Sequence, residues 1–235
     1  MGLLNVHSTI EQMMPAPKTG MSMPLFIVKG EAEEAIYKEY KTITAFTKDK
    51  EMAAANTNPI LLSKLAYVWN QEQRHEKFAV LISNDIAKSL EKYREKEFYF
   101  LLSGLDDKAT QTEIAKFVDG GVNVHMRQAV LRFDDVAGAT PFTKYKNVIT
   151  MIAPKVKELV EGTEENEGGP EYVDVTEHID AAAVAEIGSR TPGSVTWKFR
   201  RLNGVTPQFL DEDEMNAIDD IHAIAYVIKH NAPQT

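Results

Sequence analysis

The sequence predicts a mainly α-helical protein: a helical bundle followed by a small C-terminal helical module with short strands. Two long stretches indicate it, because residues 31–54 and 60–86 both carry apolar side chains three to four positions apart. That spacing places apolar groups on one side of a helix. A third, alanine-rich stretch over residues 180–188 ends at Gly188 and indicates a further helix.

The composition limits the class of protein. The chain has 235 residues, 43% of them hydrophobic, which suffices to fill one large or two small domains. No apolar run approaches the ~20 residues of a membrane span, and the first residues lack the basic and apolar regions of a signal peptide. With no cysteine, disulfides, thiolate metal sites and cysteine nucleophiles are excluded. We expect a cytoplasmic protein without membrane contact.

Changes in composition divide the chain into segments. Residues 1–29 contain several prolines, and methionines at 13, 14, 21 and 23, and predict an extended arm with a short strand at 25–28. Residues 30–161 form the predicted bundle, residues 162–171 an acidic linker, and residues 172–235 the C-terminal module.

Capping residues and breakers predict where the helices begin and end. A helix over 31–54 is followed by one that Thr57 or Asn58 caps, with Pro59 in its first turn. The apolar stripe of this second helix consists of Leu61, Leu65, Val68, Ala79, Ile82 and Ile86, interrupted by Glu72 and His75.

The later elements follow from similar signals. Another helix begins after Asp106–Asp107 and ends at Gly120, whereas residues 122–136 fit a strand and a helix equally well. Residues 141–162 predict a helix bent at Pro154, and residues 215–228 a final amphipathic helix behind an acidic first turn.

Charge is distributed unevenly. The net charge is −9, but residues 161–180 hold eight acids and no base, while residues 181–204 hold four bases against Glu186. Residues 205–235 are acidic again, with six acids against one lysine. A compact basic segment therefore lies between two acidic ones, and local charge of this kind selects partners.

The basic segment predicts a short exposed helix. Thr191 offers a cap and Pro192 suits a first helical position. A helix from there would place Val195, Phe199 and Leu202 on one side. Ser194, Trp197, Arg200 and Arg201 would point away from that side. The candidates for nucleic-acid contact are these four together with Arg190 and Lys198.

Residues 181–204 resemble a helix-turn-helix motif of the Myb/SANT-like or sigma-region-four-like kind, on the stretch G-S-R-T-P-G-S-V followed by K and R-R-L. The resemblance implies that Ser194, Trp197 and Arg201 face base edges. It also implies that Arg190, Lys198 and Arg200 meet phosphates. The match covers about a tenth of the chain. The sequence departs from the family in two ways. Val184 stands where the first helix usually carries a small residue, and no helix is evident before that first helix.

Two other interpretations of the region stay open. Val195, Trp197 and Phe199 alternate with polar residues, and Asn203–Gly204 is a strong hairpin signal, so residues 195–210 also fit a β-hairpin. The segment also fits a small basic surface of a protein-interaction domain.

Two weaker motifs occur in the predicted bundle. Residues 110–133 begin like a helix-turn-helix, with His125, Arg127, Gln128 and Arg132 as polar candidates. Glu72 and His75 form E-x-x-H, the pair that binds iron in ferritin-like bundles, although the second copy that such a site needs is not evident. A polar pair that bonds to a neighbouring helix and fixes register is the preferred explanation of it.

These observations predict a non-catalytic DNA-binding protein that acts on duplex DNA through residues 190–201. The alternative is a structural or assembly protein that binds protein partners, or copies of itself, through the bundle and the methionine-rich arm. A ferritin-like metal bundle is a distant third. No catalytic residue, metal ligand set or cofactor motif is expected, because phosphate loops, G-x-G-x-x-G, H-E-x-x-H and G-x-S-x-G are all absent from the sequence.

Overall fold

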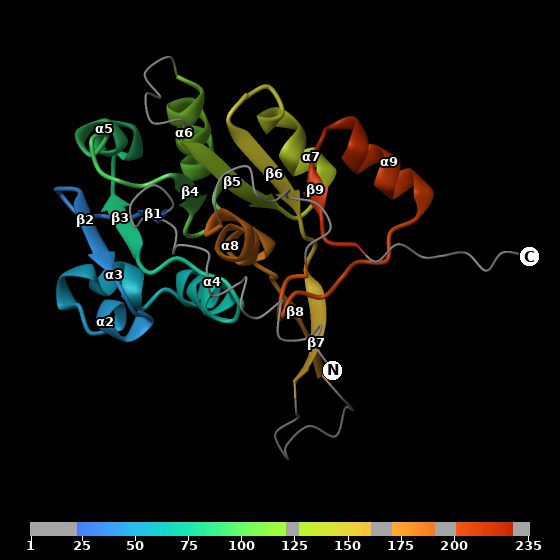
Figure 1. The fold of residues 1–235 in the computed structure, drawn as a ribbon, viewed down its shortest axis with the longest axis horizontal. Coiled ribbons are helices and arrows are strands. Elements are labelled where there is room, and N and C mark those ends of the chain that lie inside the picture. The colour runs from blue at the N-terminus through green and yellow to red at the C-terminus, as the bar shows by residue number, and fades with distance from the viewer. Residues whose placement is uncertain (1–22, 121–126, 161–170, 191–200, 228–235) are drawn as a thin grey trace, which may run out of the picture.

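The protein has an α/β architecture. The computed structural model describes residues 23–120, 127–160, 171–190 and 201–227. Its centre is a seven-stranded sheet of order β2-β3-β1-β4-β5-β6-β9, with helices on both faces (Figure 1). The predicted all-α bundle is therefore wrong, since most of the apolar segments assigned to helices pair as strands.

The elements follow one another along the chain mostly as alternating strands and helices. The strands are β1 (Pro24–Lys29), β2 (Ile36–Tyr40), β3 (Phe78–Ser83), β4 (Phe100–Ser103), β5 (Gln128–Phe133), β6 (Val148–Ile152), β7 (Val156–Val160), β8 (Glu171–Val175) and β9 (Ile224–Ala225). The helices are α2 (Ile43–Thr47), α3 (Ala53–Asn56), α4 (Pro59–Trp69), α5 (Ile86–Lys92), α6 (Lys108–Asp119), α7 (Val136–Ala139), α8 (Ile179–Ala183) and α9 (Glu212–Asp220). Short 3-10 turns lie at Lys50–Met52 and Thr140–Phe142, and a π turn, Val184–Gly188, extends α8.

Strand β1 occupies the interior of the sheet and pairs in parallel with β3 on one side and β4 on the other. The parallel pairing continues through β5, β6 and β9, and only β2 runs antiparallel, against β3. Parallel neighbours need a crossover rather than a tight turn, and helices supply several of those crossovers.

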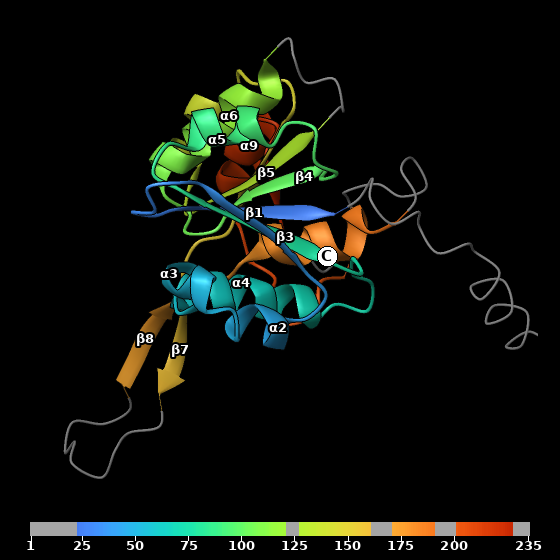
Figure 2. The same cartoon turned by 90° about the vertical axis from the view of Figure 1, so that its left-hand side faces the viewer.

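Alternate side chains of each strand contribute to two cores, one on each face of the sheet. Phe26 and Val28 of β1 pack in the layer that contains α4 and α8. Leu25 and Ile27 point the other way, into the layer that contains α5 and α6. Figure 2 shows these helices on opposite sides of the sheet.

The long stripe over residues 60–86 is divided between a helix and a strand. Asn58 caps α4 and Pro59 stands in its first turn, as expected, but α4 ends at Trp69 and residues 78–83 form β3. Every residue of β3 is buried. A strand covered on both faces is apolar throughout and does not alternate, so its sequence also fits the helical spacing.

Three further helix predictions need correction. The predicted helix over 31–54 contains β2 and short helical turns, and residues 148–152 of the element predicted over 141–162 form β6. The final helix ends at Asp220, after which the chain forms β9. The strand near 25–28, the helix after Asp107 and the alanine-rich helix before Gly188 are confirmed as β1, α6 and α8 with its π turn.

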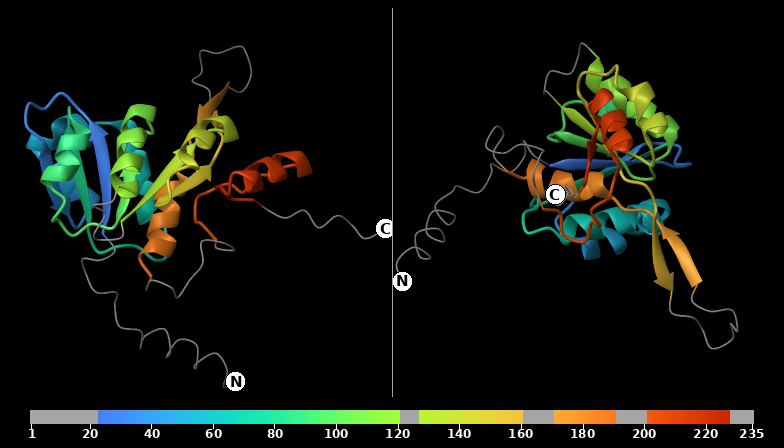
Figure 3. Two further views of the ribbon diagram at one scale, coloured as in Figure 1. Left: turned by 90° about the horizontal axis from the view of Figure 1, so that it is seen from above. Right: turned by 90° about the vertical axis from the view of Figure 1, so that its right-hand side faces the viewer.

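Strands β7 and β8 form a separate two-stranded antiparallel sheet. This hairpin connects β6 to α8 and projects away from the body of the protein (Figure 3). Residues 162–170 of the predicted acidic linker lie between its strands and outside the described residues, and Glu171 begins β8.

Candidate functional site: a buried charge cluster

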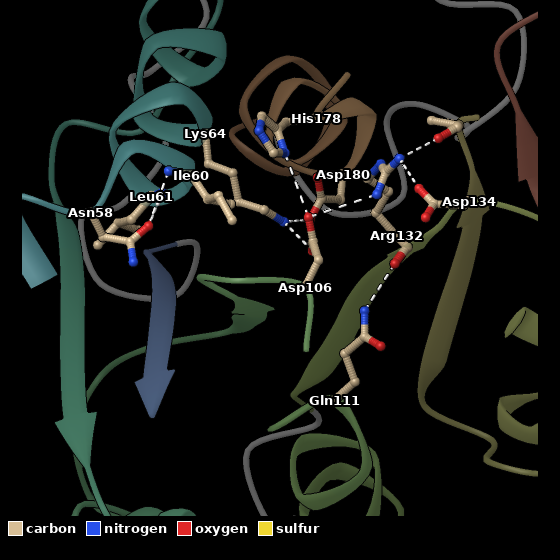
Figure 4. A network of polar contacts seen from close by, with 11 residues as sticks. Asn58, Ile60, Leu61, Lys64, Asp106, Gln111, Arg132, Asp134, His178 and Asp180 are labelled. Atoms are coloured by element: carbon tan, nitrogen blue, oxygen red, sulfur yellow. Dashed lines mark hydrogen bonds and ion pairs between the residues drawn. The ribbon is translucent and has the colours of Figure 1, made fainter. Parts of the chain in front are cut away.

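The most unusual side chains of the core are charged. Lys64, Asp106, Arg132, His178 and Asp180 meet between the sheet, α4 and α8, and we call them the buried charge cluster (Figure 4). The side chains of Lys64 and Asp180 are 0% exposed. Ionised groups are almost never fully buried unless they are paired, so this cluster is the first place to look for chemistry.

Local sequence positions each member. Lys64 lies on the buried side of α4 beside Leu61 and Leu65, and Asp180 lies in the first turn of α8. Asp106 follows the end of β4 and takes a positive φ of 55°, a conformation that aspartate tolerates better than most residues.

Lys64 is the cation between two carboxylates. Its Nζ donates to Oδ1 of Asp106 at 2.6 Å and also to Oδ2 of Asp180. The other oxygen of Asp106 lies 3.6 Å from Nδ1 of His178 and 3.9 Å from a guanidinium nitrogen of Arg132. The cluster therefore joins α4, the loop after β4, strand β5 and the start of α8.

Arg132 extends the network toward the edge of the sheet. Its guanidinium donates to Asp134 and to the carbonyl oxygen of Ala153. The side-chain amide of Gln111 in α6 donates to the carbonyl oxygen of Arg132 at 2.9 Å. Helices on both faces of the sheet are thus tied to β5.

The neighbouring charges favour the ionised forms of Lys64 and Asp106 although both are removed from water. Burial opposes the charge of Lys64, yet Asp106 and Asp180 raise the pKa of its ammonium group. Burial also opposes the charge of Asp106, while Lys64, His178 and Arg132 together hold the pKa of its carboxyl below its ordinary value. Both groups are therefore held in their charged forms.

The cluster lies at the carboxyl ends of the parallel strands β4 and β5, where open α/β sheets commonly bind ligands. Here α8 packs over that region, and it contributes Asp180 to the cluster. Within the part of the chain that the structure describes, some polar atoms nonetheless have no hydrogen-bond partner, namely Nδ1 of His178, Oδ1 of Asp180 and Nε of Arg132. Among the described residues, no group of three or more His, Asp or Glu is placed to hold a metal ion. The arrangement acts as an ionic link between elements.

Most of the predicted nucleic-acid contacts cannot be placed. Ser194, Trp197, Lys198 and Arg200 lie outside the described residues. Of the other candidates, Arg190 binds the backbone and carboxylate of Glu186, whereas Arg201 is exposed. An arginine paired to a carboxylate offers little to a phosphate.

Neither of the two motifs in the predicted bundle has the helical arrangement expected of it. Glu72 and His75 lie in the connection between α4 and β3, where Glu72 is exposed and His75 is buried with its Nε2 3.1 Å from the carbonyl oxygen of Val184. The second helix-turn-helix candidate contains α6 and β5, so Gln128 and Arg132 stand on a strand. His125 lies outside the described residues.

Arg127 of that motif is buried, and its guanidinium donates to the carbonyl oxygens of Arg94, Lys96 and Phe98. It also stacks on the ring of Phe98, 3.9 Å from the ring centre. Arg127 therefore stabilises the loop before β4 through these hydrogen bonds, and its guanidinium is not available to contact nucleic-acid bases.

The sequence reasoning missed the buried charge cluster. One signal was present, since Lys64 stands between Leu61, Leu65 and Val68 on the apolar side of a predicted helix. A lysine in that position indicates a buried acidic partner, but the partners are 42 and 116 residues away in the chain.

No protein-family model and no curated protein matches the chain. The described residues contain no helix long and apolar enough to cross a membrane.

Proposed function

We propose that the protein is a structural subunit that assembles with further copies of itself through the β7–β8 hairpin. The observation that carries the proposal is the separation of this hairpin from the main sheet. Neither β7 nor β8 pairs with any other strand in the part of the chain that the structure describes.

An isolated two-stranded sheet is only marginally stable in water, and its outer edges expose unpaired backbone groups. At the base of the hairpin, Val156 pairs with Val175 and Lys157 with Asp174. The two valines are partly buried, whereas Lys157 and Asp174 are exposed. A strand of another chain that pairs with either edge would satisfy those groups and stabilise the hairpin.

Exposed apolar side chains support the same function. The side chain of Phe209 is 73% exposed and that of Val227 is 38% exposed. Val227 pairs with Gln208 in a short β-bridge at the edge of the main sheet, and Phe209 is the residue after Gln208. Large apolar groups gathered at an edge are typical of surfaces that bind protein. The buried charge cluster suits a rigid subunit, since it links the helices to the sheet.

Sedimentation velocity over a range of protein concentrations tests the proposal, together with hydrogen exchange of the hairpin amides. We expect particles larger than one chain, and slower exchange over 156–160 and 171–175 in the assembled state than in the dilute one. A variant in which residues 157–174 are replaced by a short Gly-Ser linker should stay monomeric and keep the unfolding midpoint of the body. A single chain at every concentration, with unchanged exchange, would contradict the proposal.

DNA binding through residues 190–201 stays a prediction, with exposed Arg201 and the local basic charge in its favour. A salt titration of duplex binding tests it, because the slope counts the phosphates contacted. The Arg200→Ala/Arg201→Ala variant should reduce both affinity and slope if the prediction is right. Equal binding by this variant and the wild type would refute it.

A further inference from the structure

Asn203 and Gly204 form the one Asn-Gly pair of the sequence, and the pair lies in a turn between two buried residues. Leu202 is 6% exposed and Val205 is 8% exposed, and both pack in the layer of α4 and α8. Gly204 takes a positive φ of 73°, a conformation that glycine adopts without steric cost. The two buried residues therefore hold the turn in place from both sides.

The backbone of Asn203 is fixed by a buried side chain. The N–H of Asn203 donates to Oε1 of Gln71 at 2.9 Å, and Nε2 of Gln71 donates to the carbonyl oxygen of Asn203 at 2.8 Å. Gln71 is 4% exposed, and its Nε2 also donates to the carbonyl oxygen of Tyr67 in α4. The side-chain amide of Gln71 thus joins residues 202–205 to the end of α4.

Gly204, by contrast, has an unpaired and accessible amide. Its N–H makes no hydrogen bond within the part of the chain that the structure describes, and the residue is exposed. Glycine carries no Cβ that would hinder the approach of its nitrogen to the side chain of the preceding residue. That side chain, Asn203, donates from Nδ2 to the carbonyl oxygen of Asn70 at 3.3 Å. An amide carbon and a free backbone nitrogen are therefore neighbours in a surface turn.

We infer that Asn203 is a modification site, at which the side chain cyclises onto the backbone of Gly204 and then opens to isoaspartate. The nitrogen of Gly204 attacks Cγ of Asn203, the Cγ–Nδ2 bond breaks, and ammonia leaves with the proton of the attacking amide. Water then opens the cyclic imide. Addition of water at the backbone carbonyl carbon gives isoaspartate, and addition at Cγ gives aspartate. The reaction consumes water, releases ammonia and requires no oxidant or reductant.

The isoaspartate changes the path of the main chain. The chain then runs through Cβ and Cγ of residue 203, so it is longer by one atom between Leu202 and Val205. It cannot keep both of these side chains in the core and also keep both hydrogen bonds to Gln71. A buried amide that loses its partners is costly, so modification weakens the link between residues 202–205 and α4.

Mass spectrometry of the full chain, aged in mildly alkaline buffer, tests the site. Trypsin cleaves after Arg201 and Lys229 and releases one peptide that contains both Asn203 and Asn216. Asn216 is exposed in α9 and is followed by alanine, so it serves as an internal control. Fragmentation of the peptide locates the change from amide to acid, and enzymatic methylation of the new carboxylate distinguishes isoaspartate from aspartate.

We expect modification of Asn203 to be about tenfold or more faster than that of Asn216, because alanine has the Cβ that glycine lacks. The rate should rise with pH, since the attacking nitrogen must lose its proton. Equal rates at the two asparagines, or no isoaspartate at Asn203, would overturn the assignment.

Hydrogen exchange tests the structural consequence. Amides of residues 202–210 should exchange faster in the aged protein than in the fresh one. An Asn203→Gln variant keeps the backbone groups that bond Gln71 but cyclises far more slowly, because its ring is larger, so its exchange should not change with age. Unchanged exchange in a wild type whose Asn203 has been converted would refute the weakened link.

Discussion

The Nζ of Lys64 lies 2.6 Å from Oδ1 of Asp106, a residue 42 positions later in the chain, and the two side chains are 0% and 12% exposed. The same ammonium group donates to Asp180, 116 positions later. One cation thus pairs with two carboxylates that the fold removes from water, and Arg132 adds a second positive charge beside Asp106.

Replacing Lys64 with Met should therefore destabilise the protein by about 3 to 5 kcal/mol, because two buried carboxylates lose their partner. Urea unfolding measures this loss. Lys77→Met is the matched control, since Lys77 pairs with Glu39 at 2.6 Å but both side chains are partly exposed. Its cost should be about 0 to 1 kcal/mol. Equal stabilities of the two variants would show that the cluster contributes little.

His75 makes stability depend on pH. Burial lowers the pKa of its imidazole from 6.5 to about 4, against the opposing effect of its hydrogen bond to Val184. The neutral ring is favoured in the folded state, so its contribution is complete above about pH 6.5 and is lost as the pH falls toward about 4.

Between about pH 7.5 and pH 5, the free energy of unfolding should fall by about 2 kcal/mol through His75. The measurement is urea unfolding at both pH values. In a His75→Gln variant, which keeps an amide donor near Val184, this part of the pH dependence should disappear. The prediction fails if the variant loses as much stability as the wild type over that interval.

Gly104 fits its position because it has no side chain. A methyl group there would lie 2.6 Å from Cγ2 of Val28 and 3.1 Å from the carbonyl oxygen of Ile27. Gly104→Ala should cost about 1 to 3 kcal/mol, since backbone at the end of β1 would have to move. Gly138→Ala, whose nearest contact is 3.3 Å, is the control and should change the unfolding midpoint little.

Phe209 provides a test of the exposed apolar edge. Because its side chain is 73% exposed, Phe209→Ser should leave the unfolding midpoint unchanged. If that edge takes part in assembly, the variant should need a higher concentration to assemble, which light scattering measures. Ile60→Ser, also at an exposed site, serves as the comparison. Identical assembly by the wild type and Phe209→Ser would remove Phe209 from the interface.

Several local features were predictable from sequence. Asn58 and Pro59 begin α4, Asp107 caps α6, and the acidic turn after Asp211 begins α9. Each depends on side chains bonding backbone groups within three residues, so no distant part of the chain is needed. The strand at β1 was also predictable.

The candidate site was much less predictable. Lys64 is recognisable as a cation on the apolar side of α4. Nothing near it in the sequence indicates that Asp106 and Asp180 are its partners. Likewise, the sequence of residues 78–83 fits both a helical stripe and a buried strand. Pairing with β1 and β2 decides that it is a strand. In both cases the structure depends on residues that lie far away in the sequence.

The sequence alone determined the positions of the main caps, the β1 strand, the absence of disulfide chemistry and the separation of acidic and basic segments. Only the tertiary structure decided that the apolar segments form a mixed sheet, that Lys64 is paired, and that β7 and β8 stand apart from that sheet. The physical reason is that helix caps and charge are local properties. Strand pairing and charge burial depend on which distant segments exclude water together.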